Sequence, residues 1–230
     1  MEEDIFGRTR RLFGCEAMGR LAAARVAVFG VGGVGGHVVE TLVRSGVGSI
    51  DLFDADTVAP SNINRQVVAL HSTIGRNKVD VAAERAMDIN PEVKVRAVKM
   101  FYLPENADSV DLSVYDYVAD CIDTVAAKVE IAARCDNAGI PIIACMGAGN
   151  RLDPTAFRIR DIYKTEHDPL AKVMRKKLRE LGIRRLCTVA SSEPPTRPED
   201  GLRTPASNAF APAAAGLLMA SHIIKAVAGI

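Results

Sequence analysis

The sequence predicts a single α/β domain whose sheet is doubly wound and mostly parallel, and three observations support this. Short apolar runs recur through the first 150 residues, as strands buried on both faces require. Stretches with one apolar helical face separate the runs, as crossover connections between parallel strands do. A glycine-dense turn over 30–36 directly follows the first run. The 230 residues and the 48% hydrophobic content suffice for one such domain.

Strands and helices are expected to alternate along the chain. We predict strands over 26–29, 50–53, 93–98, 117–121 and 141–145, and helices over 16–24, around 38–43, over 78–89 and over 125–137, with helical crossovers between successive strands. The rhythm changes after residue 150. The expected elements there are a strand over 157–162, a basic helix over 168–181, a Pro- and Ser-rich loop over 191–207 and an apolar helix over 211–230. We therefore divide the domain into a core, 1–150, and a C-terminal extension, 151–230.

The glycines of the turn fit a phosphate-binding pattern. Gly30, Gly32 and Gly35 form G-x-G-x-x-G between a strand and a helix, and Gly33 lies inside the motif. Glycines let the backbone turn tightly and approach a phosphate, and the N-terminus of the following helix favours an anion. Asp54 ends the second strand about 20 residues further on, where Rossmann-like domains meet a ribose hydroxyl. The pattern indicates a nucleotide but not which one.

Further polar residues argue for ATP rather than NAD. Each follows the carboxyl end of a strand or begins a helix nearby: Asp54, Asn62, Arg65, Lys78 and Asp123. Ligands of doubly wound sheets bind at this edge, so all five can line one crevice. Two cations suit a triphosphate, and the extra carboxylate suits Mg²⁺. The other readings of Lys78 and Asp123 are an exposed lysine and a helix N-cap.

This set of groups suits chemistry at phosphorus. No serine or cysteine is placed as a nucleophile, so we expect the substrate to supply its own carboxylate. Attack of that carboxylate on the α-phosphate of ATP would give an acyl-adenylate and pyrophosphate. Catalysis would then rest on positioning and charge neutralisation.

Composition limits the partners and the compartment. The formal net charge of +1 gives no global attraction to nucleic acid or membranes. The N-terminus has no apolar export segment, and the five scattered cysteines show no zinc-type spacing, so we expect reduced thiols in a cytoplasm. The apolar helix over 211–230 is interpreted as a packing helix rather than a membrane anchor, without stable membrane insertion.

Two basic segments have two readings each. The helix over 168–181 carries Lys172, Arg175, Lys176 and Arg179, either as a solvated face or as a contact for an RNA backbone. The cluster over 8–11 is either a solvated arm or an arm whose arginine reaches a phosphate, its own or that of a partner subunit. Composition favours the solvated arm.

The motifs together resemble the ThiF/MoeB/HesA superfamily of E1-like adenylating enzymes. They are G-x-G-G-x-G, Asp54-x-Asp56, Ser61-Asn62-x-Asn64-Arg65-Gln66, Gly75-x-x-Lys78 and Asp120-Cys121-x-Asp123. The resemblance implies the E1-like fold, with this set around Mg²⁺-ATP. Asp54 would meet the ribose, Asn62, Arg65 and Lys78 the phosphates, and Asp123 the Mg²⁺. It also implies a homodimer in which Arg11 reaches the partner's ATP, which reverses the solvated-arm interpretation.

The C-terminal extension resembles one branch of this superfamily, the tRNA threonylcarbamoyladenosine dehydratases. The similar segments are Asp161-Ile162-x-Lys164-Thr165-x-x-Asp168-Pro169-Leu170-Ala171, the basic helix, and Ser191-Ser192-Glu193-Pro194. The branch implies adenylation of the threonyl carboxylate of N6-threonylcarbamoyladenosine in tRNA, then attack by its own carbamoyl group and net loss of water. The basic helix would then bind the tRNA backbone.

Three other functions stay open. The chain could adenylate the C-terminal glycine of a ubiquitin-like sulfur carrier, which needs a groove for an extended tail. It could be a nucleotide-binding module without chemistry that partners a sulfur-transfer system, such as a cysteine desulfurase and its sulfur acceptor. An NAD oxidoreductase is the weakest alternative, because it leaves Arg65 and Lys78 unexplained.

Overall fold

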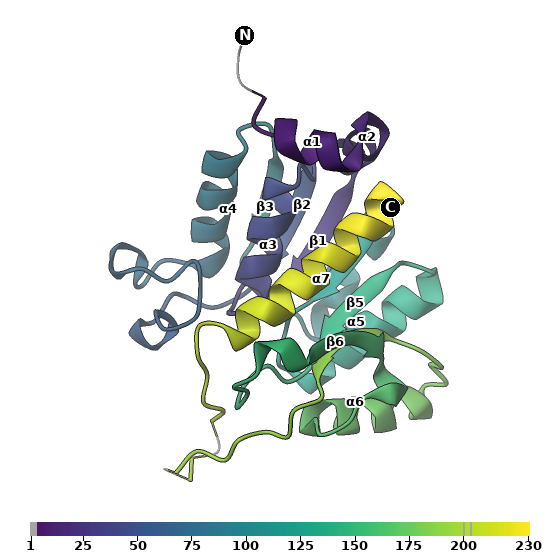
Figure 1. Cartoon of the computed structure of the whole chain (residues 1–230). Helices are drawn as coiled ribbons and strands as arrows, with labels where there is room; N and C mark the ends of the chain where they lie inside the picture. Colours follow the sequence, from purple (N-terminus) through teal and green to yellow (C-terminus); the bar gives the residue numbers. More distant parts are fainter. Residues whose placement is uncertain (1–3, 200, 203) are drawn as a thin grey trace.

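The protein is organised around one mixed sheet with helices on both faces (Figure 1). The computed structural model describes residues 4–199, 201–202 and 204–230. Within these residues the sheet has seven strands in the order β3-β2-β1-β4-β5-β7-β6. They are β1 (Arg25–Phe29), β2 (Ser49–Phe53), β3 (Lys94–Val98), β4 (Tyr117–Asp120), β5 (Ile142–Cys145), β6 (Phe157–Asp161) and β7 (Cys187–Ser191). All neighbours are parallel except β6 and β7, so the prediction of a doubly wound, mostly parallel sheet is confirmed.

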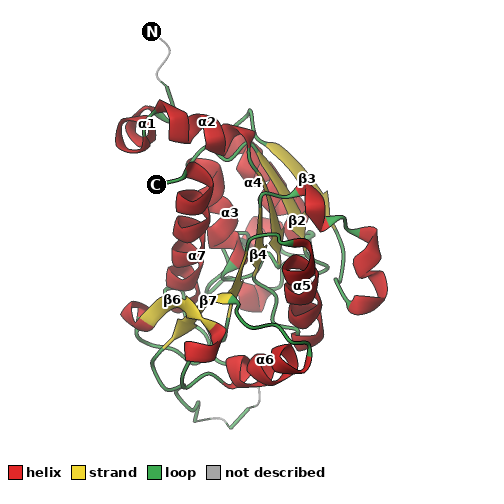
Figure 2. Ribbon diagram, turned by 90° about the vertical axis from the view of Figure 1, so that its right-hand side faces the viewer, coloured by secondary structure: helices red, strands yellow, loops and turns green. Residues whose placement is uncertain are grey.

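Helices form a layer on each side of the sheet (Figure 2). The helices are α1 (Gly7–Phe13), α2 (Cys15–Ala23), α3 (Gly35–Arg44), α4 (Lys78–Ile89), α5 (Val125–Ala138), α6 (Pro169–Glu180) and α7 (Ala211–Ala228). Alternate residues of β1 face opposite sides: Val26 and Val28 pack with α3, α4 and α7, whereas Ala27 and Phe29 pack with α5. Burial of both faces explains why this strand is apolar at consecutive positions.

The strand order reverses direction between β1 and β4, and the register brings the ends of the central strands together there. Phe29 pairs with Phe53 of β2 on one side and with Asp120 of β4 on the other. The carboxyl ends of β1, β2 and β4, where the chain leaves these strands, therefore lie side by side at one end of the sheet. In open α/β sheets the crevice outside such a switch point is the ligand site. The fold thus places the glycine turn and the loop after β4 side by side.

Three predictions of secondary structure were incomplete. The connection between β3 and β4 contains short 3₁₀ turns, Pro104–Ser109 and Leu112–Val114, instead of a crossover helix, because no helical apolar period runs through 99–116. Strand β7 was not predicted, although Thr188 to Ser191 are buried. The segment around the basic cluster is helix α1 rather than an extended arm. Residues 1–3 of the N-terminus, and 200 and 203 of the predicted loop, lie outside the described residues.

The apolar C-terminal helix α7 packs across α3 and the sheet, as predicted. By length and composition it could cross a membrane, but half of it is buried inside this domain. At Gly216 the helix comes so close to the start of α3 that a Cβ would lie 2.5 Å from the carbonyl oxygen of Val34. A contact this specific, together with burial of Met219 and Ile223, marks α7 as a core helix.

Candidate active site

The glycine turn occupies the narrow space between the ends of β2 and β4. Gly30 has φ +87°, and its N–H donates to the Phe53 carbonyl at 2.7 Å. A Cβ at Gly30 would lie 2.8 Å from the Cys121 carbonyl oxygen, and one at Gly35 would lie 1.8 Å from the Gly30 carbonyl oxygen. Only glycine fits these two positions. The turn then enters α3, whose N-terminus begins at Gly35 beside the ends of the central strands and favours an anion there.

Alanine at position 35 is expected to destabilise the protein by about 3 kcal/mol or more and to abolish nucleotide binding, because its Cβ overlaps backbone. Urea unfolding and equilibrium binding of ATP measure the two effects. Gly36→Ala is the matched control, since a Cβ there would meet Val67 at an ordinary 3.7 Å. A Gly35→Ala protein as stable as Gly36→Ala would contradict this account of the turn.

Asp54 connects the second strand to the turn. Its Oδ2 accepts the Val31 N–H at 2.6 Å, and its Oδ1 accepts the Asp56 N–H at 2.8 Å. Asp54 is half-buried at the edge where the resemblance expects the ribose. In this structure the carboxylate holds the backbone of the turn, so its position beside the glycines is fixed.

Lys78 lies at the first position of α4 and is almost completely buried. Its ammonium forms an ion pair of 2.7 Å with the carboxylate of Asp56, and its N–H donates to the Asp56 carbonyl at 3.0 Å. The side chain is 7% exposed. A cation in the first turn of a helix is unfavourable unless an anion lies beside it. Asp56 is that anion here, and a bound phosphate would be a second one.

The segment between Asp56 and Lys78 folds over the glycine turn. Asn62 is buried and accepts the Ala59 N–H, and Arg65 donates to the Ser61 carbonyl and to Asn64 Oδ1. Arg65 Cγ would lie 3.4 Å from a Cβ at Gly33. Asn64 donates to the carbonyl of Ser207, which joins this segment to the end of the predicted loop.

Gln66 carries a buried polar atom that lacks a partner. Its side-chain carbonyl oxygen makes no hydrogen bond within the described residues, and its amide nitrogen would lie 3.8 Å from a Cβ at Gly32. A buried polar group without a partner is costly, so a ligand or water is needed beside it. That partner must be a hydrogen-bond donor, such as a hydroxyl group or water, because the unpartnered atom is an acceptor. The glycine cradle, the helix N-terminus and the two cations Arg65 and Lys78 together fit the phosphates of a nucleotide.

Asp123 follows β4 and is exposed at the same edge of the sheet. The loop before it is joined to β1, because the Cys121 N–H donates to the Phe29 carbonyl at 2.8 Å. No group of three or more His, Cys, Asp or Glu residues gathers as a metal site within the described part of the chain. The exposed carboxylate of Asp123 is the kind of ligand that fits Mg²⁺, which proteins usually hold by one or two carboxylates together with phosphate oxygens and water.

A buried ion pair beneath this loop was missed by the sequence analysis. Lys128 of α5 and Asp120 are both 0% exposed, and the ammonium lies 2.8 Å from the Asp120 carboxylate. Burial raises the pKa of the Asp120 carboxyl, whereas the charge of Lys128 opposes this rise. In the folded protein Lys128 lies on the helix face of the buried residues Ile131 and Cys135.

The cysteines near the crevice are not suited to nucleophilic attack. Burial raises the pKa of the Cys145 thiol to about 12 and that of Cys121 well above its ordinary value. Both thiols are therefore protonated at neutral pH, and the thiolate is the nucleophilic form. This supports the expectation that the substrate supplies the attacking group.

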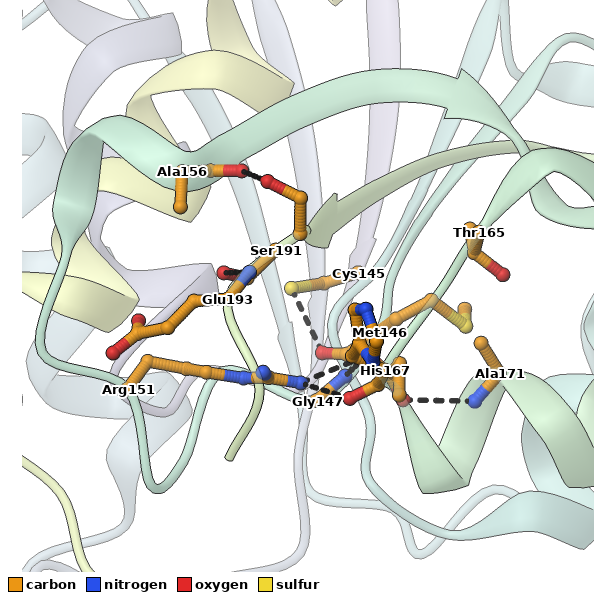
Figure 3. A network of polar contacts seen from close by, with 12 residues as sticks. Cys145, Met146, Gly147, Arg151, Ala156, Thr165, His167, Ala171, Ser191 and Glu193 are labelled. Atoms are coloured by element: carbon orange, nitrogen blue, oxygen red, sulfur yellow. Dashed lines mark hydrogen bonds and ion pairs between the residues drawn. The ribbon is translucent and has the colours of Figure 1, made fainter. Parts of the chain in front are cut away.

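The extension is joined to the core by a second buried network, shown in Figure 3. Arg151, 1% exposed, donates to the His167 carbonyl at 3.0 Å and lies 3.9 Å from Asp168. Asp168 accepts the N–H groups of Gly147 and Ala171, so it fixes the start of α6 at the end of β5. Burial lowers the pKa of the Arg151 guanidinium, and the carboxylates of Asp168 and Glu193 oppose this. Arg151 was not among the residues predicted for the site.

Arg11 lies at the opposite edge of the sheet from the crevice. Helices α1 and α2 pack at the start of β2, where the Gly48 N–H donates to the Leu21 carbonyl and a cavity is bordered by Phe6 and Lys94. A five-residue strand is roughly 16 Å long, farther than an arginine side chain reaches. The structure therefore does not bring Arg11 together with Asp123 of the same chain. Arg11 itself is exposed.

The four basic residues predicted for α6 differ in their freedom. Lys172 and Lys176 are exposed on the outer face of the helix. Arg175 is half-buried and donates to the carbonyl and the hydroxyl of Thr165. Arg179 is exposed and lies over the Tyr163 ring, 5.0 Å from its centre. Of these four predicted residues, the two lysines are thus the most available to a partner.

The fold and the crevice define an α/β nucleotide-binding domain with a triphosphate-type site at the switch between β1 and β4. The comparisons with known proteins specify the family. The sequence profile of the ThiF family matches residues 6–230, and the chain belongs to this family.

Individual relatives align with three quarters of this chain or more. It is 43% identical over 235 residues to the tRNA threonylcarbamoyladenosine dehydratase of Bacillus subtilis, covering 95% of this chain and 92% of the relative. The Escherichia coli enzyme of that name is 42% identical over 174 residues, 76% of this chain and 65% of the relative. The crystal structure of the E. coli enzyme in complex with AMP has a TM-score of 0.92 and 36% identity, covering 97% of this chain and 94% of that one. Its complex with ATP has a TM-score of 0.90.

Proposed function

We propose that this protein catalyses the ATP-dependent dehydration of N6-threonylcarbamoyladenosine in tRNA, which closes the threonylcarbamoyl group into a ring. The observation that carries the proposal is the likeness to tRNA threonylcarbamoyladenosine dehydratases over almost the full length of both chains. The geometry of the site supports it independently, because it suits a triphosphate and burial keeps the nearby thiols of Cys121 and Cys145 protonated.

The proposed reaction has two steps, adenylation of the carboxylate and closure of the ring. In the first, a threonyl carboxylate oxygen attacks the α-phosphorus of ATP, the bond to the β-phosphate oxygen breaks, and pyrophosphate leaves. In the second, the carbamoyl group attacks the activated carbonyl carbon and loses a proton, and AMP leaves with the former carboxylate oxygen. The water lost from the substrate is thus consumed in the cleavage of ATP to AMP and pyrophosphate.

The side chains of the crevice act in this scheme by position and charge. The glycine turn and the start of α3 bind phosphate oxygens through N–H groups, and Arg65 and Lys78 neutralise charge that moves toward pyrophosphate. Asp54 orients the nucleotide from the ribose side. Asp123 would hold Mg²⁺, which supplies further charge neutralisation at the phosphates. Asp56 holds the Lys78 ammonium in place, and Asn62, Asn64 and Gln66 shape the segment over the turn.

The extension, residues 151–230, would form the tRNA side of the same domain. Helix α6 begins at the carboxyl end of β5, to which Asp168 joins it, and Lys172 lies in the first turn of this helix. A basic helix beside the reacting centre matches a substrate that carries a phosphate backbone. If α6 is only a solvated face, changing its lysines should leave the tRNA affinity unchanged.

Reversing the charge of both lysines, Lys172→Glu with Lys176→Glu, is expected to weaken tRNA binding at least tenfold and to flatten its salt dependence by roughly one to two units of slope. ATP binding should not change. Lys94→Glu, an exposed lysine at the opposite edge of the sheet, is the matched control. Equal tRNA affinity and salt slope in the wild type and the double variant would return α6 to a solvated face.

We further propose that the enzyme acts as a homodimer in which Arg11 serves the partner's site. The support is its place at the far edge of the sheet, where it has no hydrogen bond or ion pair within the described residues. A cytoplasmic location is also proposed, because all five cysteines are free. A link to a cysteine desulfurase and its sulfur acceptor stays a prediction.

The experiment that tests the function is nucleoside mass spectrometry. The protein is incubated with Mg²⁺-ATP and tRNA that bears threonylcarbamoyladenosine, and the modified nucleoside is weighed after digestion. An ATP-dependent loss of one water is expected. An unchanged nucleoside, with ATP–pyrophosphate exchange only in the presence of a glycine-tailed carrier protein, would replace this function by activation of a sulfur carrier.

A further inference from the structure

A lysine without access to solvent lies directly beneath the loop that carries Asp123. Lys128 is 0% exposed, and lysines are almost never fully buried unless they are paired. Its ammonium contacts the carboxylate of Asp120 at 2.8 Å and donates to the carbonyl of Ile122 at 3.1 Å. It therefore contacts both ends of the three-residue segment that precedes Asp123.

The same segment is fixed from its other side. Asp120 Oδ1 accepts the Ile122 N–H at 3.2 Å, and the Cys121 N–H donates to the Phe29 carbonyl at 2.8 Å. The Cys121 carbonyl oxygen lies only 2.8 Å from the position a Cβ of Gly30 would take. The loop after β4 and the glycine turn are thus packed against each other without free space, so a shift of one displaces the other.

Stability alone is a poor explanation for this ion pair. Taking both charges out of water costs several kcal/mol, and apolar residues of similar size commonly replace such pairs without loss of stability. The pair instead provides direction: a charged donor aimed at the Ile122 carbonyl sets the backbone immediately before Asp123. Because Lys128 is fully buried, it acts through this backbone and not by touching a substrate.

We propose that Lys128, paired with Asp120, is a positioning residue that holds the Ile122 carbonyl and thereby sets the place of Asp123 beside the glycine turn. The inference rests on the proposed role of Asp123 toward Mg²⁺ and extends it to two residues that do not reach the crevice. Groups that orient a metal-holding side chain from behind typically change metal affinity by about 10- to 100-fold when they are removed.

The test compares ATP binding with and without Mg²⁺, so it does not depend on turnover. Asp120→Asn with Lys128→Met removes both charges while asparagine keeps an acceptor for the Ile122 N–H. We expect this variant to fold. The ratio of its ATP affinities with and without Mg²⁺, which we call the Mg²⁺ factor, should be about tenfold smaller than in the wild type. Asp51→Asn is the matched control. Asp51 lies in strand β2, and its buried carboxylate is paired with Arg25 of β1 and Arg96 of β3. The control variant should keep the full Mg²⁺ factor.

Combination with Asp123→Ala separates a positioning role from a structural one. If Lys128 acts through Asp123, the loss of the Mg²⁺ factor in the combined variant should equal that of Asp123→Ala alone. Additive losses, or a folded Asp120→Asn/Lys128→Met variant with an unchanged factor, would overturn the proposal. Should that variant not fold, Asp120→Asn alone is compared, and an unchanged factor there overturns it equally. If Asp123→Ala itself leaves the factor unchanged, the proposed role of Asp123 fails instead.

Discussion

Alanine in place of Asp123 is expected to lower the rate of adenylation by about 100- to 1,000-fold, the usual effect of removing one group that stabilises charge at a reacting centre. The carboxylate would hold the Mg²⁺ that neutralises the phosphates as pyrophosphate departs. Single-turnover release of pyrophosphate, with tRNA that bears threonylcarbamoyladenosine, measures this step. The fold should survive, because Asp123 is exposed and changes at exposed sites cost little stability.

A carboxylate on α5, the helix that follows Asp123, supplies the control for this prediction. Asp136 is exposed in the last turn of α5, at the end away from the crevice. Asp136→Ala should retain the wild-type rate. A nearly wild-type rate for Asp123→Ala would remove this residue from the mechanism, whereas equal losses in both variants would point to an effect of α5 as a whole.

Local patterns were enough to predict the central half of the fold. Strand β1 is apolar at consecutive positions because both of its faces are buried, and the glycine turn needs residues without a Cβ at Gly30 and Gly35. Both requirements are visible in the sequence. The strands added by the C-terminal extension have weaker sequence patterns. Strand β7 is flanked by a basic segment and a proline-rich loop, and only its pairing with β5 and β6 makes it a strand.

The site residues divide in a similar way. Those at the ends of strands, such as Asp54 and Asp123, were predictable because a parallel sheet collects its carboxyl ends at one edge. Lys128 and Arg151 were missed because a lone charge in a helix or a loop reads as solvated, and only tertiary packing shows that it is buried. The role of Arg11 was predicted from the family resemblance alone. The structure shows that its side chain lies too far from the nucleotide site of its own chain to reach it.

Because Arg11 and Asp123 of one chain lie far apart, a mixing experiment can show whether the two residues act in the same site. If the protein acts as the proposed homodimer, Arg11→Ala and Asp123→Ala should each be nearly inactive when purified separately. If Arg11 serves the partner's site, a heterodimer of the two variants holds one site with both residues intact and one site with neither. Random exchange of equal amounts should then restore about a quarter of the wild-type activity, because half of the dimers are mixed and half of their sites are complete.

This recovery cannot arise if each chain completes its own site, since every site in the mixture would then lack one residue. Activity is followed as water loss from the tRNA nucleoside after the two variants have been mixed and equilibrated. Mixing Arg11→Ala with Arg11→Ala, under the same conditions, shows whether exchange itself changes the rate. A mixture of the two variants that stays as inactive as its components, while heterodimers are detected by native mass spectrometry, would assign Arg11 to the structure of helix α1 and leave the phosphates to Arg65 and Lys78.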